Sequence, residues 1–515
     1  MRARACLALG RYDEAAGLAR SALAAGEVRS VPWLTHEGHH ILSRVAAAQG
    51  DHWGALEECE RAIASIERAQ SNLTVELCSN FLDDKVHVYQ DAIDGALHLG
   101  DTKRAFAYLE RAKSRALVDY LASNAEVRLR THRGTNQELV EELSRLREEH
   151  NWFYNRLYGY GLAQPAEREP KEAELRMLQE AVRDREKWIK RLLERLALQD
   201  ADNIEGIAVP EAGRLAPPAL GAGSVLLEYY FRDDGGAAFV VSEHGLEVVP
   251  LTARPSAIQR LLYQWQLNLD ATARAVSHGQ PVDGLGRNAR GILQALYRAL
   301  VQPIETHIAG RERIVVVPYG PAHWVPWHAL HDGQHYLVES HEVSTCPSSS
   351  LLRLCAGRSR RVGRSALVVA CSDGGRLPYV VREAEAVAAL LGGERHVEAQ
   401  ATRSTLVEGA ARHGVFHLAA HAEARLDNPT FAHLKLADGQ LSTVDVFNLQ
   451  LDGALVTLSA CETGRSVVTG GDELIGLSRG FLYAGAATLV QSLWRVEDGS
   501  TARLMSSFYH GLRAG

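Results

Sequence analysis

Two apolar runs near the C-terminus end on residues with reactive side chains. Residues 454–461 read Ala-Leu-Val-Thr-Leu-Ser-Ala-Cys and lead into a Glu-Thr-Gly turn, and residues 415–421 read Val-Phe-His-Leu-Ala-Ala-His. A short continuous apolar run is typical of a strand that is buried on both faces of a parallel sheet. Open α/β sheets place ligands and chemistry at the carboxyl ends of such strands. The pattern therefore predicts a thiol, Cys461, and an imidazole, His421, at one edge of one sheet.

The rest of the C-terminal half alternates apolar runs with amphipathic segments. The apolar runs predict strands at 224–231, 237–242, 246–251, 313–318, 366–370 and 487–493, with Gly235-Gly236 as the turn between the first two. The amphipathic segments predict helices at 289–301, 382–391 and 473–484, and a short crossover helix near 443–449. This alternation predicts an α/β fold with a mostly parallel sheet between helices.

The first 125 residues repeat a different pattern. A glycine, a polar turn and an alanine that opens an amphipathic run recur at Gly10, Gly50 and Gly100. This pattern resembles tetratricopeptide (TPR) repeats, in which Gly and Ala lie where two helices pack closely. The spacings of 40 and 50 residues depart from the 34-residue period of those repeats, so a generic helical bundle is the alternative. Only nine residues precede Gly10, so we expect the array to begin within a repeat.

Residues 136–200 are rich in charged residues and carry a heptad-like stripe. Its members are Leu139, Leu143, Leu146, His150, Phe153 and Leu157, then Leu175, Leu178, Val182, Arg185, Ile189, Leu192 and Leu196. The stripe is broken at 159–170, which predicts a hairpin of two antiparallel helices with a coiled-coil seam. The hairpin is either a spacer or a lever that connects the repeats to the site, and the sequence does not choose between them. The Pro- and Gly-rich residues 201–222 look like a linker.

Length, charge and cysteine spacing exclude several classes of protein. The 515 residues exceed one ordinary domain, and 46% hydrophobic with 23% charged residues is usual for a globular protein. The net charge of −7 gives no general reason to expect nucleic-acid binding, and no apolar run is long enough to cross a bilayer. The seven cysteines are scattered without CxxC spacing, which argues against a zinc cluster or a disulfide framework and favours a cytoplasmic location.

His421 and Cys461 have the chemistry of a catalytic pair. They lie 40 residues apart with one predicted crossover between them, so their strands can be neighbours. An adjacent imidazole lowers the pKa of a thiol by forming an ion pair, and two amides, those of Cys461 and of the residue after His421, could stabilise an oxyanion. The alternative is that Cys461 is an inert core thiol. His417, four residues before His421, is predicted to be a core histidine.

At these residues a family resemblance becomes specific. Residues 416–421 and 458–464 resemble the CHAT domain, a family of caspase-like cysteine peptidases often fused to TPR repeats. Further matching segments are 314–321, 326–330, 336–339, 471–480, 484–486 and 492–494, and residues 110–117 resemble the last repeat helix before such domains. The resemblance implies a caspase-like fold with Cys461 as nucleophile and His421 as base, in which no metal or cofactor is needed. It also implies cleavage of a protein substrate, an N-terminal sensor for a partner or ligand, and a role in bacterial immunity or programmed cell death.

The expected domain organisation follows from the pattern and the resemblance. We expect TPR-like repeats at 1–125, a helical hairpin and linker at 126–205, and a CHAT domain at 206–515. Within the last, a pseudo-subdomain would cover about 223–350 and a catalytic subdomain about 362–515.

The chain departs from the family at two places. Family members usually have Gly after the histidine, whereas this chain has Ala422, which resists some of the backbone angles open to glycine. We therefore expect an altered oxyanion site, which would use the amides of Ala422 and Cys461, or one held inactive at rest. The chain also stops soon after Tyr509, so we expect a shortened C-terminus.

Two acidic residues are candidates for the S1 pocket, where they would pair with a basic P1 side chain. Asp373 follows the 366–370 strand at the position where related peptidases line this pocket, and Asp472 precedes the predicted 473–484 helix. Asp373 could instead be a turn residue and Asp472 a helix cap, in which case an apolar P1 is equally compatible. The 487–494 strand is the predicted edge for an extended substrate.

The catalytic pair and the resemblance together predict a partner- or ligand-regulated cysteine endopeptidase that cleaves a protein substrate. The alternatives are a catalytically silent TPR/CHAT scaffold and thioester chemistry on a small molecule, such as an amidase.

Overall fold

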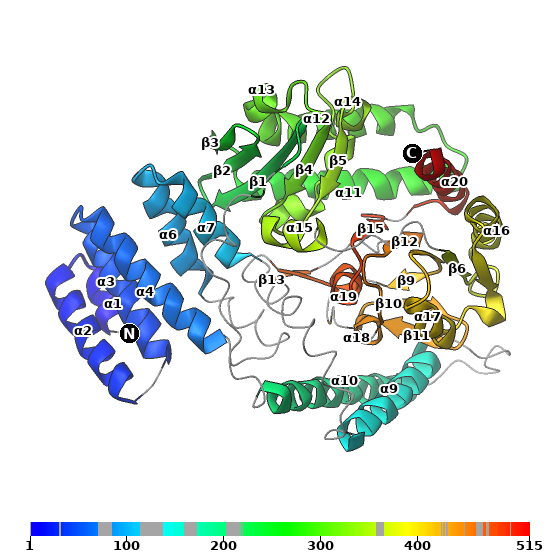
Figure 1. The fold of residues 1–515 in the computed structure, drawn as a ribbon, viewed down its shortest axis with the longest axis horizontal. Coiled ribbons are helices and arrows are strands. Elements are labelled where there is room, and N and C mark those ends of the chain that lie inside the picture. The colour runs from blue at the N-terminus through cyan, green and yellow to red at the C-terminus, as the bar shows by residue number, and fades with distance from the viewer. Residues whose placement is uncertain are drawn as a thin grey trace.

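The fold is described from a computed structural model. It describes residues 2–29, 32–70, 85–113, 137–158, 172–201, 218, 220–356, 365–423, 425, 428, 431–447, 449–459, 467–469, 473–494 and 496–514. Figure 1 shows a helical N-terminal part beside two β-sheets, with a long helical hairpin running along the lower side. Within the described ranges, no helix combines the length and apolar composition that a membrane crossing requires.

The N-terminal part consists of helices that pack in chain order. They are α1 (Arg2–Ala8), α2 (Tyr12–Arg29), α3 (Pro32–Ala48), α4 (His52–Gln70), α6 (Val86–His98) and α7 (Thr102–Ala112). Each packs mainly on its neighbours in sequence, as in stacked helical hairpins.

The repeated glycines have a different role from the one expected. Gly10, Gly50 and Gly100 have φ of 72°, 82° and 75°, and a Cβ on any of them would meet no atom within 4 Å. Glycine is therefore needed at these positions for the left-handed turn that ends a helix, and not for close packing between helices. The alanines five residues later, Ala15, Ala55 and Ala105, are buried between helices as expected.

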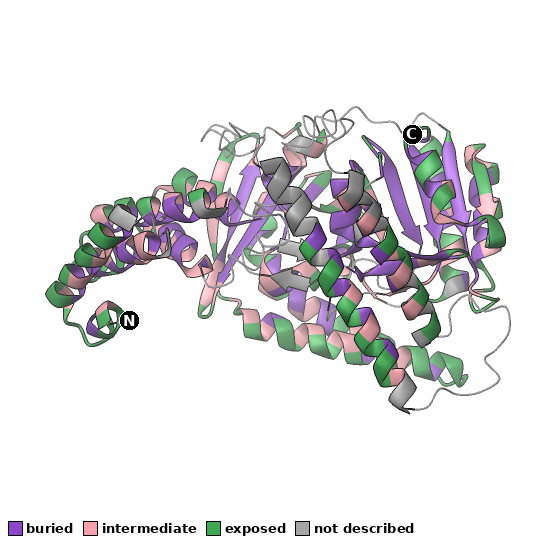
Figure 2. Cartoon of the chain, turned by 90° about the horizontal axis from the view of Figure 1, so that it is seen from below, coloured by how far each residue is buried: buried purple, intermediate pink, exposed green. Residues whose placement is uncertain are grey.

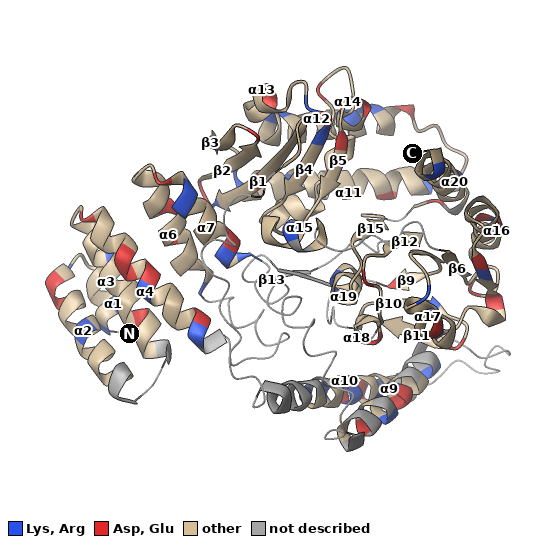
Figure 3. Cartoon of the chain, in the orientation of Figure 1, with Lys and Arg blue, Asp and Glu red and all other residues tan. Residues whose placement is uncertain are grey.

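The predicted hairpin is formed by α9 (Gln137–Tyr158) and α10 (Glu172–Ala201), and the interruption at 159–170 lies outside the described residues. Leu143 and Leu146 of α9 and Ile189 and Leu192 of α10 are buried in one cluster with Phe431. The hairpin therefore packs on the C-terminal α/β part through its apolar seam. Figure 3 shows both signs of charge along its two helices.

The first sheet has the order β3-β2-β1-β4-β5. Its strands are β1 (Ser224–Arg232), β2 (Gly235–Ser242), β3 (Gly245–Leu251), β4 (Arg313–Val317) and β5 (Glu342–Thr345). β1 to β3 are antiparallel, and β1, β4 and β5 are parallel. Short elements follow β3 and β4: α13 (Glu305–Ile308), α14 (Leu337–Ser340) and the 3-10 turns at Gln302–Ile304, Gly320–Trp324 and Trp327–Ala329.

Alternation along β1 gives this sheet two apolar faces. Leu227 and Tyr229 pack with α11 (Pro255–Ser277) and α12 (Asp283–Leu300). Leu226 and Tyr230 face the opposite way, into a core that they share with helices α4, α6 and α7 of the N-terminal part. Since successive side chains of a strand point to opposite faces, one strand joins two cores.

The turn between β1 and β2 is at Asp233-Asp234 and not at the predicted Gly235-Gly236. Both glycines already belong to β2, where Gly235 is opposite Arg232. A Cβ on Gly236 would lie 2.3 Å from the carbonyl oxygen of Tyr230. Glycine is therefore required here by close approach of the neighbouring strand.

The second sheet is entirely parallel and has the order β15-β12-β8-β6-β7. Its strands are β6 (Ala366–Ala370), β7 (Glu394–Val397), β8 (Val415–Ala419), β12 (Leu455–Ser459) and β15 (Thr488–Gln491). α16 (Val380–Leu391) and α20 (Asp498–Ala514) cover one face, and α17 (Arg403–Ala410), α18 (Thr443–Val446) and α19 (Leu477–Tyr483) cover the other. Figure 2 shows the strands as the most buried part of the molecule.

The helix predicted at 473–484 is shorter than expected. Residues Glu473–Ile475 form β14, which pairs with β13 (Val467–Thr469), and α19 begins only at Leu477. Val467, Val468 and Ile475 are β-branched, which favours the strand pair over a helical turn. A three-stranded sheet was also not predicted: β9 (Ala422–Glu423), β10 (His433–Leu436) and β11 (Gly439–Ser442).

Candidate functional site

β8 and β12 are adjacent parallel strands, so the two apolar runs end at the same edge of the sheet. Ala419 is paired with Ser459 at their carboxyl ends. His421 is two residues beyond Ala419, and Cys461 is two residues beyond Ser459 in the sequence. The structure describes His421, whereas Cys461 lies outside the described residues.

His421 is fixed by its backbone at the point where β8 leads into the three-stranded sheet. Its carbonyl oxygen accepts a hydrogen bond of 2.8 Å from the amide of Lys435 in β10. Its side chain is 37% exposed, and Nε2 lies 3.8 Å from Oδ2 of Asp373. The imidazole is therefore accessible from solvent on one side and faces a carboxylate on the other.

Ala422 begins β9 and is opposite Leu434 of β10. Among the described residues other than glycine, only Asp373 and Glu398 have a positive φ, so Ala422 needs no backbone conformation that alanine resists. Hydrogen-bonded and non-hydrogen-bonded pairs alternate in antiparallel strands. Since His421 and Lys435 form a hydrogen-bonded pair, the amide of Ala422 points away from β10.

Asp373 lies near the catalytic candidate and does not face open solvent. Its carboxylate is 11% exposed, contacts the ammonium of Lys435 and lies 3.3 Å from Arg376. Lys435 was not singled out by the sequence, because a single lysine in a short strand carries no recognisable pattern. Asp472, the second S1 candidate, lies outside the described residues.

His417 is a core residue, as the sequence predicted. It is fully buried, with Nε2 2.9 Å from Oε1 of Glu383 and Nδ1 3.3 Å from the hydroxyl of Tyr509. Tyr509 donates a 2.7 Å hydrogen bond to Thr457, and burial raises the pKa of Tyr509. This polar chain attaches α20 to the centre of the sheet, so His417 has a structural role.

A buried carboxylate on the hairpin holds the segment that follows His421. Glu186 accepts a 2.8 Å hydrogen bond from Asn428 and lies 3.1 Å from Arg425 and 3.4 Å from His150. Burial opposes ionisation of Glu186, but the hydrogen bond from His150, the charge of Arg425 and the Asn428 amide together lower its pKa. The predicted stripe contained Arg185, which is 29% exposed, whereas the neighbouring Glu186 is buried.

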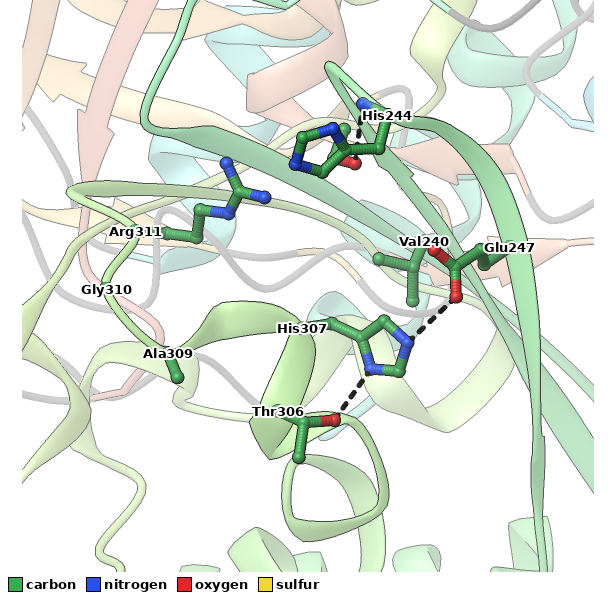
Figure 4. Close-up of a pocket in the computed structure, with 9 residues that line it drawn as sticks. Val240, His244, Glu247, Thr306, His307, Ala309, Gly310 and Arg311 are labelled. Atoms are coloured by element: carbon green, nitrogen blue, oxygen red, sulfur yellow. Dashed lines mark hydrogen bonds and ion pairs between the residues drawn. The ribbon is translucent and has the colours of Figure 1, made fainter.

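A cavity of about 360 Å³ lies in another part of the molecule. Ser242, Glu247, His307 and Arg311 are among its lining residues, at the β3 edge of the first sheet (Figure 4). It shares no residue with the surroundings of His421. Within the described ranges, no group of three or more His, Cys, Asp or Glu is arranged to hold a metal ion.

Comparisons with known proteins give one family match and distant relatives. Residues 290–515 match the CHAT domain. Tetratricopeptide repeat protein 28 of Homo sapiens and that of Mus musculus are each 26% identical over 292 residues, covering 44% of this chain and 12% of their own length. The chain thus spans about an eighth of the length of these relatives.

Among solved structures, the Saccharomyces cerevisiae separase–securin complexes at 3.0 and 2.6 Å are similar to the chain. Their TM-scores are 0.40 and 0.38 at 9% and 10% identity, over 96% and 95% of this chain and 45% of each separase chain. The helical N-terminal part, the parallel sheet between helices and the CHAT match together confirm the predicted fold class, a caspase-like α/β domain preceded by helical repeats. The chain is therefore similar to CHAT-domain proteins over residues 290–515 and to a tetratricopeptide repeat protein.

Proposed function

We propose that the protein is a cysteine endopeptidase in which Cys461 is the nucleophile and His421 is the base. The main support is the register of β8 and β12, in which Ala419 and Ser459 are paired neighbours. At no more than about 3.6 Å per residue, two residues extend at most about 7 Å beyond each strand end. His421 and Cys461 each follow one of the two paired residues by two positions. The Cys461 thiol and the His421 imidazole can therefore lie close enough to interact.

The proposed reaction proceeds through a thioester. The Cys461 thiolate attacks the carbonyl carbon of a peptide bond, the C–N bond breaks, and the imidazolium of His421 gives its proton to the leaving amine. Water, deprotonated by His421, then attacks the thioester and releases the acid and the thiolate. The amides of Ala422 and Cys461 would stabilise the oxyanion, and the direction of the Ala422 amide, away from β10, is compatible with this role.

A protein substrate would bind as an added strand. Among the described strands, β15 lies at the edge of the parallel sheet and pairs with β12. An extended peptide can hydrogen-bond to such an edge and present its scissile bond to the carboxyl ends of the strands. The P1 side chain would then be selected by residues beside His421.

The helical N-terminal part would control the site. Helices α4, α6 and α7 share a core with the first sheet, so a partner or ligand bound to the repeats has a packed connection to the CHAT domain. We place the protein in the cytoplasm, and we expect activation by such a partner in bacterial immunity or programmed cell death. The proposed boundaries remain 1–125, 126–205 and 206–515.

A thiol-labelling experiment tests the catalytic pair. The full-length chain is treated with a limiting amount of iodoacetamide, and alkylation of each cysteine is followed by mass spectrometry. Cys461 should react at least about tenfold faster than Cys346, because burial raises the pKa of the Cys346 thiol. His421→Ala should abolish this difference, whereas the exposed control His278→Ala should preserve it.

The silent-scaffold and amidase alternatives predict different labelling and cleavage results. A silent scaffold would label Cys461 no faster than Cys346 or Cys355, and this result would refute the proposal. Rapid labelling of Cys461 without cleavage in a peptide library that contains the activating partner would indicate small-molecule amidase chemistry.

A further inference from the structure

Three ionisable side chains from three segments meet beside the sheet edge. Asp373 follows β6, His421 follows β8, and Lys435 belongs to β10. One carboxylate oxygen of Asp373, Oδ1, contacts the Lys435 ammonium, and the other, Oδ2, faces Nε2 of His421 at 3.8 Å. The Asp373 and Lys435 side chains are 11% and 14% exposed, so both are largely shielded from water.

The backbone holds the carboxylate in this place. Asp373 has φ of 55° and is followed by Gly374 and Gly375, which are also left-handed. The hydroxyl of Ser372 closes the turn by accepting a 3.0 Å hydrogen bond from the amide of Gly375. A left-handed backbone at an aspartate is uncommon and persists where the surroundings fix it.

We propose that Asp373 is a positioning residue for His421 and that Lys435 limits the strength of this interaction. The inference rests on the proposed function, because it gives Asp373 a role through the catalytic base instead of in the S1 pocket. A carboxylate that already contacts a lysine would have to release it before it could bind a basic P1 side chain. The same carboxylate is in place to orient the imidazole and to stabilise its protonated form.

Asp373 and Lys435 have opposite electrostatic effects on the protonation of His421. An opposite charge within about 4–6 Å favours the charged form of a titratable group, and a like charge disfavours it. Asp373 therefore favours the imidazolium of His421, and Lys435 reduces that effect by occupying Oδ1. The surrounding charges are Arg376, which is 69% exposed, Glu398 near Cys371, and Glu423, which lies 3.8 Å from His433.

The test measures the titration midpoint of His421 by NMR. The full-length Cys461→Ala protein is labelled with 13C-histidine, and the His421 resonance is assigned by its loss in His421→Gln. Adding Asp373→Asn should lower the titration midpoint of His421 by about one pH unit. Adding Lys435→Gln should raise the midpoint, and the exposed control Glu408→Gln should leave it unchanged.

The proposal requires the two variants to shift the His421 titration midpoint in opposite directions. Shifts in the same direction in the two variants, or no shift in Asp373→Asn, would overturn the proposal. If Asp373 lines S1 instead, Asp373→Asn in the enzyme with an intact Cys461 would reduce cleavage after Arg and Lys and leave the His421 midpoint unchanged. Because the NMR measurement uses a protein without the thiol, it remains valid even if Cys461 proves not to be a nucleophile.

Discussion

Lys113 and Glu228 form an ion pair in which both side chains are completely buried. Nζ of Lys113 lies 3.5 Å from Oε1 of Glu228 and donates hydrogen bonds to the carbonyl oxygens of Tyr229 and Pro318. Lys113 caps α7, and Glu228 lies in the middle of β1. The C-terminal end of α7 therefore packs against the first sheet. Burial, and next the nearby charge of Glu110, raise the pKa of Glu228, while Lys113 opposes this rise.

Removing the lysine should destabilise the whole chain. Lys113→Met leaves two carbonyl oxygens and the Glu228 carboxylate without their cation, and breaking such a buried pair costs about 3–5 kcal/mol. The midpoint of urea unfolding, followed by circular dichroism, should fall accordingly. Lys103→Met, at an exposed position of the same helix, is the control. A midpoint equal to that of the control would show that the pair contributes little.

Glu110 should stabilise a helix in the other part of the chain. Its two carboxylate oxygens accept hydrogen bonds of 3.0 and 2.6 Å from the amides of Ser349 and Ser350, at the start of α15 (Ser349–Ala356). Loss of a side-chain cap costs about 0.5–2 kcal/mol. Glu110→Ala should therefore speed hydrogen exchange in α15.

The same exchange experiment examines how far this effect extends. Leu351 of α15 is packed against Tyr483 of α19. Faster exchange should reach α19 if α15 connects the repeats to the segment after Cys461. Exchange confined to α15, with the exposed control Glu14→Ala unaffected, would argue against that connection.

The contact between the hairpin and the segment after His421 should depend on pH. The pKa of Glu186 is lowered in the folded protein, so its ionisation contributes stability above the ordinary value of 4.5, and this stability is lost as the pH falls through the folded pKa. Glu186→Gln should weaken the contact at neutral pH. Limited proteolysis near Arg425 should accelerate severalfold, because a buried charge partner is lost. Glu180→Gln, exposed on the same helix, should behave as the unmodified protein.

The hydroxyl of Tyr509 should stabilise the packing of the last helix. Tyr509→Phe removes the 2.7 Å hydrogen bond to Thr457 and the contact with His417 in a buried site. Leaving such polar groups unsatisfied costs about 1–3 kcal/mol. A lower thermal midpoint is expected, and Tyr263→Phe, at a 65% exposed position, should show no change.

Replacing Ala422 by glycine should not activate the site. Ala422 is paired in β9 and needs no glycine-like conformation, so Ala422→Gly should only increase the entropy cost of folding, by about 0.5–1 kcal/mol. The rate of Cys461 labelling should stay within a few-fold of the unmodified rate. A large gain in reactivity would mean that alanine restrains the oxyanion site after all.

Much of the second sheet could be predicted because its signals are local. The strand at 366–370 was predicted with the bounds of β6, and the runs at 415–421 and 454–461 contain β8 and β12, which are neighbours as expected. A continuous apolar run is readable without knowing its partners, because burial on both faces requires it. The predicted helix at 473–484 was wrong in its first turn, because residues 473–475 form β14 and pair with β13.

The sequence by itself determined the strands that form continuous apolar runs, the order of helical and α/β parts, and the two reactive residues that follow paired strands. Only the tertiary structure showed that Asp373 faces His421 and contacts Lys435, since the three residues come from separate segments and Lys435 belongs to no recognisable pattern. The same holds for Glu110, Lys113 and Glu186, which look like surface charges on amphipathic helices and are buried. A charged side chain can be buried only where a distant segment supplies its partner, and that segment is not visible in the local sequence.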